Sequence, residues 1–450
     1  MATQTSTTQS YQENEKRLRD EIEKKHGKSV EQLYQEREKR IRDAVELRVP
    51  DRVPVMMARN SGTHFAASYT GVPLSAAYYD PIAWKEAYRK TILDFEPDVC
   101  VPQIAMNSGT VLELLDTKQQ RWPGGTLPPD ATNQFVEGEY MKADEYDHFL
   151  SDPSDFTFRR YLPRVYGTLE PITKLPPFRN MVGGTGFTAI LGFFLRPEFK
   201  ELADKLTKAA QEQEKARKLS VGFAEEMARL GFPALERGGA GGGAPSGAPF
   251  DVISDYLRGM RGAMLDMYRC PDKLLAACDK LLEWRIATAT PASPKTKDDL
   301  VVGGGGALHR GSEGFMSIKQ FEKFYWPSFK KSLMAAIDLG YITSSFCEGI
   351  WNDRLEYWLE LPKGKSILSF ERTDMFKAKE VLGGHACILG NVPPTLLDTG
   401  SPQDVEEYCK KLIKVCGKGG GFILANGSDM HHAKPANVKA MIDSVKKYSP

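Results

Sequence analysis

The feature that most limits how this sequence can fold is the repeated alternation of short apolar runs with longer, charged, helix-like segments. Short β-branched or apolar runs predict buried strands, and the segments between them predict helices. The candidate strands are Val53–Met57, Val99–Ile104, Leu300–Gly303, Ile342–Cys347, Ser366–Phe370, Cys387–Leu389 and Gly421–Leu424. Strands that alternate with helices over this length predict an α/β protein with a closed (β/α)8 TIM barrel of parallel strands.

The N-terminal segment differs from the rest because it carries many charges and few apolar side chains. Apolar residues such as Ile22 and Leu33 recur there at loose helical spacing, with a break near Gly27. This pattern predicts extra N-terminal helices. We therefore expect residues 1–47 to form a tail and charged helices, and residues 48–450 to form the barrel.

The overall charge of the chain excludes several classes of partner. Sixty lysine and arginine side chains face 59 aspartate and glutamate side chains, which leaves a net charge of +1. No global field therefore favours nucleic acid or an anionic membrane. Seven cysteines are an odd number in a chain too long to need disulfides, and the N-terminus has no apolar stretch after its first charges. These features predict a cytoplasmic protein without a membrane segment.

Polar residues that directly follow the apolar runs are the first candidates for a site, because a parallel barrel binds ligands at the C-terminal ends of its strands. The C-terminal half supplies such residues from five successive strand ends: His309, Cys347, Glu348, Glu371, Arg372, Asn391, Asn426, Ser428, His431 and His432. We expect Trp351 and the early Arg59 to lie beside them.

These side chains allow two kinds of chemistry. His309, Cys347 and Glu348 are residue types that hold Zn²⁺ with an open coordination position. Alternatively, Glu348 or Glu371 acts without metal as a proton donor whose pKa is raised by burial or by the other carboxyl group. Each residue also has a structural interpretation, since cysteine and tryptophan are most often buried apolar side chains.

Several segments resemble the uroporphyrinogen decarboxylase superfamily. These are PDRVPV near the start, FCEGIWNDRLEYWLELPKG, ILGNVPP, GGGFIL and PANVKAM, in that order, with the strongest similarity from Asp251 onward. The resemblance implies a (β/α)8 barrel and a homodimer. It also implies one of two activities, which are porphyrinogen decarboxylation and zinc-assisted methyl transfer between a corrinoid and another methyl donor or acceptor.

The sequence departs from both patterns. Decarboxylases of the superfamily carry an RQAGR-like arginine pair, an aspartate in an FSDI-like segment and a late histidine, whereas this chain has Arg59 alone, Ala105 and Ser428. Methyltransferases of the superfamily bind zinc through a His-x-Cys pair and a late cysteine, which here read Ser345, Cys347 and Ser428. Three missing features disfavour porphyrinogen decarboxylation, and one of the zinc ligands is retained.

The leading hypothesis is a methyltransferase that moves a methyl group between a small methylated substrate and a corrinoid, with or without the assistance of zinc. The corrinoid (cobalamin) is expected on a partner protein, because the chain has no DxHxxG motif. The assigned roles are catalysis by Glu348, Glu371 and His309; zinc binding by His309, Cys347 and Glu348; and substrate binding by Arg59, Asn391, Trp351, Ser428 and His431. The alternatives are a metal-free decarboxylase or lyase of a cyclic or aromatic acid, and a non-catalytic tetrapyrrole or corrinoid binder.

Overall fold

Six parallel strands form the centre of the molecule. The structure, a computed structural model, describes residues 2–57, 61–99, 108–235, 243–294 and 300–449. The strands are β1 (Val55–Met56), β4 (Val302–Leu308), β5 (Ile342–Cys347), β6 (Ser366–Phe370), β7 (Cys387–Val392) and β8 (Phe422–Asn426), and their order in the sheet is β1-β8-β7-β6-β5-β4. They match six of the predicted strands.

Single parallel bridges continue this sheet at both edges. Val99 pairs with Met56 beside β1, and Ser246 pairs with Gly305 beside β4. The described chain thus has eight strand positions in barrel order, and the fold is the predicted (β/α)8 barrel. The predicted strand Val99–Ile104 lies outside the described residues beyond Val99.

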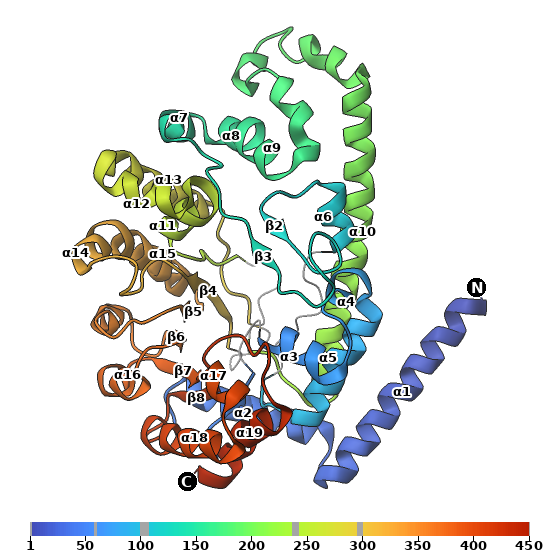
Figure 1. Ribbon diagram of the computed structural model, residues 1–450, viewed down its shortest axis with the longest axis vertical. Coiled ribbons are helices and arrows are strands. Elements are labelled where there is room, and N and C mark those ends of the chain that lie inside the picture. Colours follow the sequence, from blue (N-terminus) through green and yellow to red (C-terminus); the bar gives the residue numbers. More distant parts are fainter. Residues whose placement is uncertain (1, 58–60, 100–107, 236–242, 295–299, 450) are drawn as a thin grey trace.

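Helices surround the strands (Figure 1). The longer ones are α5 (Pro81–Phe95), α12 (Gly259–Arg269), α13 (Pro271–Ala287), α15 (Trp326–Asp338), α16 (Met375–Leu382), α18 (Pro402–Cys416) and α19 (Pro435–Tyr448). Several begin with proline, whose fixed φ angle suits the first helical position. Further helices and helical turns are α3 (Ser61–Thr70), α4 (Ala76–Tyr79), α11 (Pro249–Val252), η6 (Ile253–Arg258), α14 (Ile318–Gln320), η7 (Phe321–Tyr325), η8 (Leu355–Glu360) and α17 (Pro394–Thr399).

Strand side chains alternate between the barrel interior and the layer beneath the helices, because successive side chains of a strand point to opposite faces. The interior set packs against α2 (Val30–Val45) and comprises Met56, Val302, Ile342, Ile367, Cys387, Leu389, Ile423 and Ala425, with Ile41, Ala44 and Val45 of the helix. The outer set includes Leu308, Cys347 and Phe370, and it packs against the surrounding helices. The set to which a residue belongs decides whether its side chain can reach the open C-terminal end of the barrel, which we call the mouth.

The N-terminal helices begin earlier than the sequence suggested. Helix α1 (Ala2–His26) occupies the stretch expected to start as a tail. Its N-terminal end projects away from the barrel in Figure 1, whereas Ile22 in its C-terminal half packs against Trp84 and Tyr88 of α5. Helix α2 covers the N-terminal end of the barrel, opposite the strand ends that carry the candidate residues.

A buried ion-pair network attaches α2 to the barrel. Asp98 is fully buried, and its carboxylate accepts hydrogen bonds from Arg40 Nη1 of α2 at 2.7 Å and from Arg52 Nη1 at 2.7 Å. The same carboxylate accepts the Val55 backbone N–H at 2.9 Å, which fixes the start of β1. Arg52 belongs to the PDRVPV segment, so the structure gives that motif a role in holding the fold.

The connection between the Val99 and Ser246 positions is a long insertion that extends beyond the barrel (Figure 1). It contains α6 (Gly109–Leu114), the hairpin β2 (Gln120–Arg121) and β3 (Gln134–Phe135), then α7 (Tyr146–Ser151), α8 (Pro153–Phe156), α9 (Leu162–Val165) and α10 (Pro197–Arg229). The insertion has a small apolar core of its own, in which Leu169 and Ile172 pack against Phe199. Within the described residues, no helix combines the length and apolar character needed to cross a membrane.

We expect Asp98→Ala to lower the free energy of unfolding by about 3–5 kcal/mol, because Arg52 loses its carboxylate partner and the largely buried Arg40 keeps only the exposed Asp51. Urea denaturation followed by circular dichroism measures this change. The control is Asp443→Ala, which removes an exposed ion pair with Lys439 and should cost less than about 0.5 kcal/mol. Equal effects of the two substitutions would contradict the role given to Asp98.

Candidate functional site

The ion pair between His309 and Asp255 lies at the C-terminal end of β4. His309 follows the strand directly, and its Nδ1 lies 2.5 Å from Asp255 Oδ2 on η6. The hydrogen bond to Asp255 raises the pKa of His309 to about 9. The imidazole is therefore a cation at pH 7, with Nδ1 occupied and Nε2 directed toward Glu348 Oε2 at 3.5 Å.

Asp251 fixes the backbone that carries this histidine. Its Oδ2 accepts the His309 backbone N–H at 3.0 Å and the Tyr325 hydroxyl at 2.7 Å, and its Oδ1 accepts the Arg310 backbone N–H at 3.0 Å. Burial, together with the nearby charge of Asp255, raises the pKa of Asp251 to about 6. The two aspartates are four residues apart, so one holds the loop backbone while the other holds the imidazole ring.

Glu348 and Glu371 follow the neighbouring strands β5 and β6. Burial raises the pKa of Glu348, and the charge of Glu371 raises it further against the opposing effect of His309. The Glu371 carboxylate accepts the Gly349 backbone N–H at 2.6 Å, which joins the two loops. The structure thus brings together His309, Glu348 and Glu371, the three residues proposed from the sequence as catalytic.

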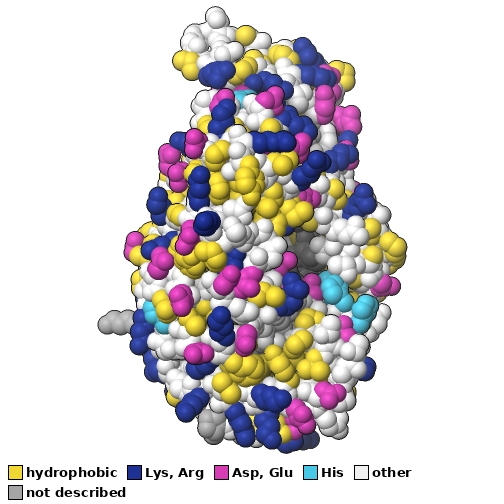
Figure 2. Space-filling view, turned by 60° about the vertical axis from the view of Figure 1, so that its left-hand side comes forward, with side chains coloured by type: hydrophobic (Ala, Val, Ile, Leu, Met, Phe, Trp, Pro, Cys, Tyr) yellow, Lys and Arg dark blue, Asp and Glu magenta, His cyan; other side chains and the backbone are white. Residues whose placement is uncertain are grey.

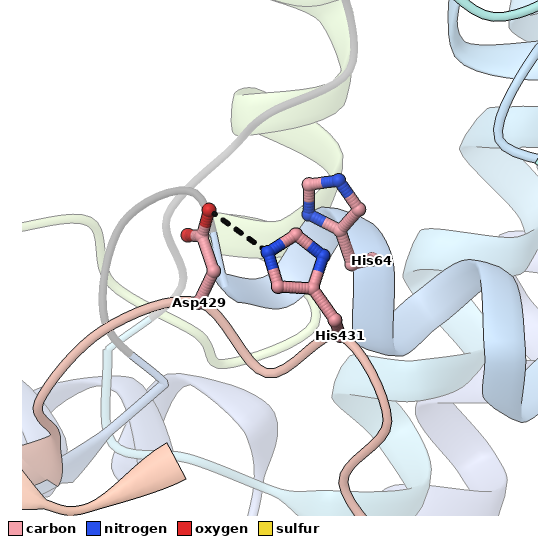
Figure 3. Close-up of side chains that lie close together, drawn as sticks. All are labelled: His64, Asp429 and His431. Atoms are coloured by element: carbon pink, nitrogen blue, oxygen red, sulfur yellow. Dashed lines mark ion pairs between the residues drawn. The ribbon is translucent and has the colours of Figure 1, made fainter. Parts of the chain in front are cut away.

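A second group of side chains comes from the loop after β8 and from α3. Asp429, His431 and His64 lie close together, with the His431 and His64 rings at a centroid distance of 4.0 Å (Figure 3). Asp429 Oδ2 lies 3.6 Å from His431 Nε2. Burial raises the pKa of Asp429, and Glu371 adds to this rise, so Glu371 lies between the His309 group and this second group.

The zinc site proposed from the sequence does not assemble. Cys347 is fully buried in the outer layer with Leu308 and Phe370, and burial holds the pKa of its thiol well above the usual range. Its neighbour Glu348 faces the mouth, because adjacent strand residues point in opposite directions. The assignment of Cys347 as a ligand is therefore wrong, and His309 and Glu348 alone do not make a three-ligand site.

Two residues proposed as substrate contacts instead have structural roles. Trp351 is fully buried against Phe321, and its indole N–H donates to the Glu348 carbonyl at 2.9 Å. The Asn391 amide donates to the Thr373 carbonyl at 2.7 Å and accepts from the Tyr408 hydroxyl at 3.2 Å. Both side chains position the loops after β5 and β6 rather than offer groups to a ligand.

The remaining predicted contacts lie at the mouth or outside the described chain. Ser428 and His431 are half-buried on the loop after β8. Arg59 lies outside the described residues. His432, next to His431, is exposed.

The sequence analysis missed four residues of the site: Asp251, Asp255, His64 and Asp429. The two aspartates precede β4 by about fifty residues, so a search just after each strand could not find them. Their spacing of four residues on one helical face was the available signal. His64 lies five residues after Arg59, and Asp429 lies between Ser428 and His431, but neither was singled out.

Several carboxyl groups line the described part of the mouth. Asp255, Glu348, Glu371 and Asp429 contribute carboxyl groups, whereas the guanidinium of Arg310 is paired with Asp255 at 2.9 Å. Figure 2 shows one face of the molecule, on which histidine side chains border a hollow near the middle. A ligand at this mouth therefore meets several carboxyl groups and one cationic proton donor, His309.

Comparisons with known proteins agree with this architecture. The family model "Uroporphyrinogen decarboxylase (URO-D)" matches residues 239–448. The uroporphyrinogen decarboxylase of Idiomarina loihiensis is 30% identical over 97 residues, which are 21% of this chain and 27% of that protein. The corresponding protein of Chlorobium phaeovibrioides is 33% identical over 81 residues, which are 17% of this chain and 22% of that protein. The matched regions thus span about a quarter of these relatives.

A solved structure covers much more of the chain. The methyltransferase from Methanosarcina mazei aligns with 91% of this chain and 98% of its own, with a TM-score of 0.55 and 17% identity. This likeness concerns the fold. The family match thus relates residues 239–448 to the uroporphyrinogen decarboxylase family, and the solved structure extends the similarity in fold to most of the chain.

We expect Cys347 to resist alkylation by iodoacetamide in the folded protein, because its thiol is buried and its pKa is raised. Mass spectrometry of the digested protein locates the label. The matched control is Glu348→Cys, which places a thiol one residue away on the opposite face and should react readily. Equal labelling at the two positions in the folded variant would contradict the orientation of β5.

Proposed function

We propose that this protein is a methyltransferase that takes a methyl group from a small methylated substrate and delivers it to a corrinoid carried by another protein. The family match over residues 239–448 and the fold shared with a methyltransferase support this class of activity. The observation that carries the proposal is the charged state of the mouth, where a cationic His309 faces carboxyl groups.

His309 is placed to act as the proton donor. Its Nδ1 is held by Asp255, so Nε2 is the atom that faces the mouth and Glu348. When the bond between the methyl carbon and a heteroatom breaks, the electron pair stays on the heteroatom. Transfer of the Nε2 proton to that atom neutralises the leaving group. The corrinoid would supply the nucleophile that accepts the methyl group.

A proton donor at the mouth favours an uncharged methylated substrate, such as a methyl ether or thioether, because its leaving group would otherwise carry a negative charge. A substrate with several carboxylates would be repelled by Glu348, Glu371 and Asp429. Of the cationic side chains near these loops, Arg310 is paired with Asp255, and Arg372 lies 3.8 Å from the Glu371 carboxylate. This balance argues against porphyrinogen decarboxylation, whose substrate carries acetate and propionate groups.

A metal-free decarboxylase or lyase is the second candidate. The family model and the curated relatives named uroporphyrinogen decarboxylase favour it. In that reaction His309 or Glu348 would protonate the carbon that loses carbon dioxide. No step of either reaction is assigned to zinc at His309, Cys347 and Glu348, because that set does not assemble.

The proposal is tested by incubating the protein with cob(I)alamin, as a substitute for the protein-bound corrinoid, and a panel of methyl ethers, thioethers and methylamines. We expect loss of the cob(I)alamin absorbance together with formation of the demethylated product. His309→Gln should lower the rate by about 10²–10⁴-fold, because it removes the proton donor. The control His432→Ala changes an exposed histidine of a neighbouring loop and should retain the rate. Release of carbon dioxide from carboxylated substrates without methyl transfer would overturn the proposal.

The pH dependence gives an independent prediction. With an active donor, we expect the rate of methyl transfer to fall as the pH rises through about 9, because His309 then loses its proton. A pH profile of single-turnover rates measures this change. The residual rate of His309→Gln should lack the decline near pH 9, whereas an unchanged profile would assign the proton to another group.

A further inference from the structure

We propose that His64, Asp429 and His431 form a binding site for one zinc ion on the side of the mouth opposite His309. The three side chains come from two segments far apart in the sequence, α3 after β1 and the loop after β8. These segments are brought together because β1 and β8 are neighbours in the barrel. The site shares no residue with the zinc set proposed from the sequence.

The distances fit a metal ion after a small adjustment. Among the residues that the structure describes, these three offer ligand atoms that all lie within 4.8 Å of one another. Ligands of a tetrahedral zinc ion, with bonds of about 2.0–2.1 Å, lie roughly 3.4 Å apart. The separation of 3.6 Å between His431 Nε2 and Asp429 Oδ2 is already close to that value. In Figure 3 the Asp429 carboxylate faces the His431 ring, and His64 stands beside it.

A hydrogen bond outside the group orients His431 for binding. Its Nδ1 lies 3.3 Å from the Thr132 hydroxyl oxygen, which can accept the ring N–H. In the neutral tautomer with the proton on Nδ1, the lone pair of Nε2 faces the Asp429 carboxylate, so two electron-pair donors point at each other. A cation between them turns this repulsion into attraction. Metal-binding histidines usually have such an outer partner, which fixes the tautomer and the orientation of the ring.

The surroundings favour a divalent cation that solvent can reach. Glu371 places another carboxyl group close to Asp429. His64 is 9% exposed, whereas the Asp429 and His431 side chains are 33% exposed, so the ion would be anchored on the buried side and open toward the mouth. Two imidazole nitrogens and one carboxylate oxygen form the three-ligand type of catalytic zinc site, with a fourth position left for water or substrate.

This proposal does not depend on methyl transfer, and it is tested without an activity assay. Protein stripped of metal with a chelator is titrated with Zn²⁺ against a chromophoric competitor, and elemental analysis gives the stoichiometry. We expect one zinc per chain. His431→Gln and Asp429→Asn should each weaken binding by more than 100-fold, since even the loss of an outer partner costs about 10–100-fold. Thr132→Val should fall within that smaller range.

The matched controls are His432→Ala and His309→Ala, which remove one histidine next to the site and one across the mouth. Both should bind zinc as tightly as the unaltered protein. Replacement by Co²⁺ should give the visible absorption of a four-coordinate ion, and this absorption should disappear in His431→Gln. Circular dichroism confirms that each variant is folded. Absence of zinc binding, zinc retained in the folded Asp429 and His431 variants, or zinc lost in His309→Ala would overturn the proposal.

Discussion

The hydrogen bonds made by Asp251 and Asp255 are the constraint on which the rest of the candidate site depends. Asp251 holds the backbone of the loop after β4, and Asp255 holds the ring of His309. This pair of carboxylates keeps a cation at the mouth, although burial alone would lower the pKa of an imidazole. The same arrangement disfavours the ionised form of Asp251, whose pKa rises to about 6 because it is buried near a second carboxylate.

Side chains of different chemical types follow different strands around the mouth. The proton donor His309 follows β4, and the carboxyl groups of Glu348 and Glu371 follow β5 and β6. Next come Asp429 and His431 after β8, with His64 of α3 beyond β1. The strand order thus places residues from distant parts of the chain side by side around the mouth. Glu371 lies between the group of His309 and the group of His431.

The sequence predicted the barrel and the edge that carries the candidate site, but it could not assign the direction of each side chain. Cys347 and Glu348 are adjacent, yet the first is buried under the helices and the second faces the mouth. The residue types that follow a strand do not show which of two neighbours faces the mouth and which faces the helices. Trp351 and Asn391 were assigned to the substrate for a related reason, since the sequence does not show that Trp351 binds a carbonyl of its own loop and Asn391 one of the loop after β6. The insertion between Val99 and Ser246 lacks the alternation of strands and helices that marks the barrel. The sequence therefore did not show that it extends beyond the barrel.

The central claim is that Asp255 keeps His309 protonated at neutral pH, and an NMR titration of the His309 imidazole tests it most directly. The account predicts a midpoint near pH 9 in the unaltered protein. In a folded Asp255→Asn variant the midpoint should move toward about 6.5, the value of an unperturbed histidine. A midpoint near 6.5 in both proteins would contradict the account, because His309 would then lack the proton that it is proposed to donate.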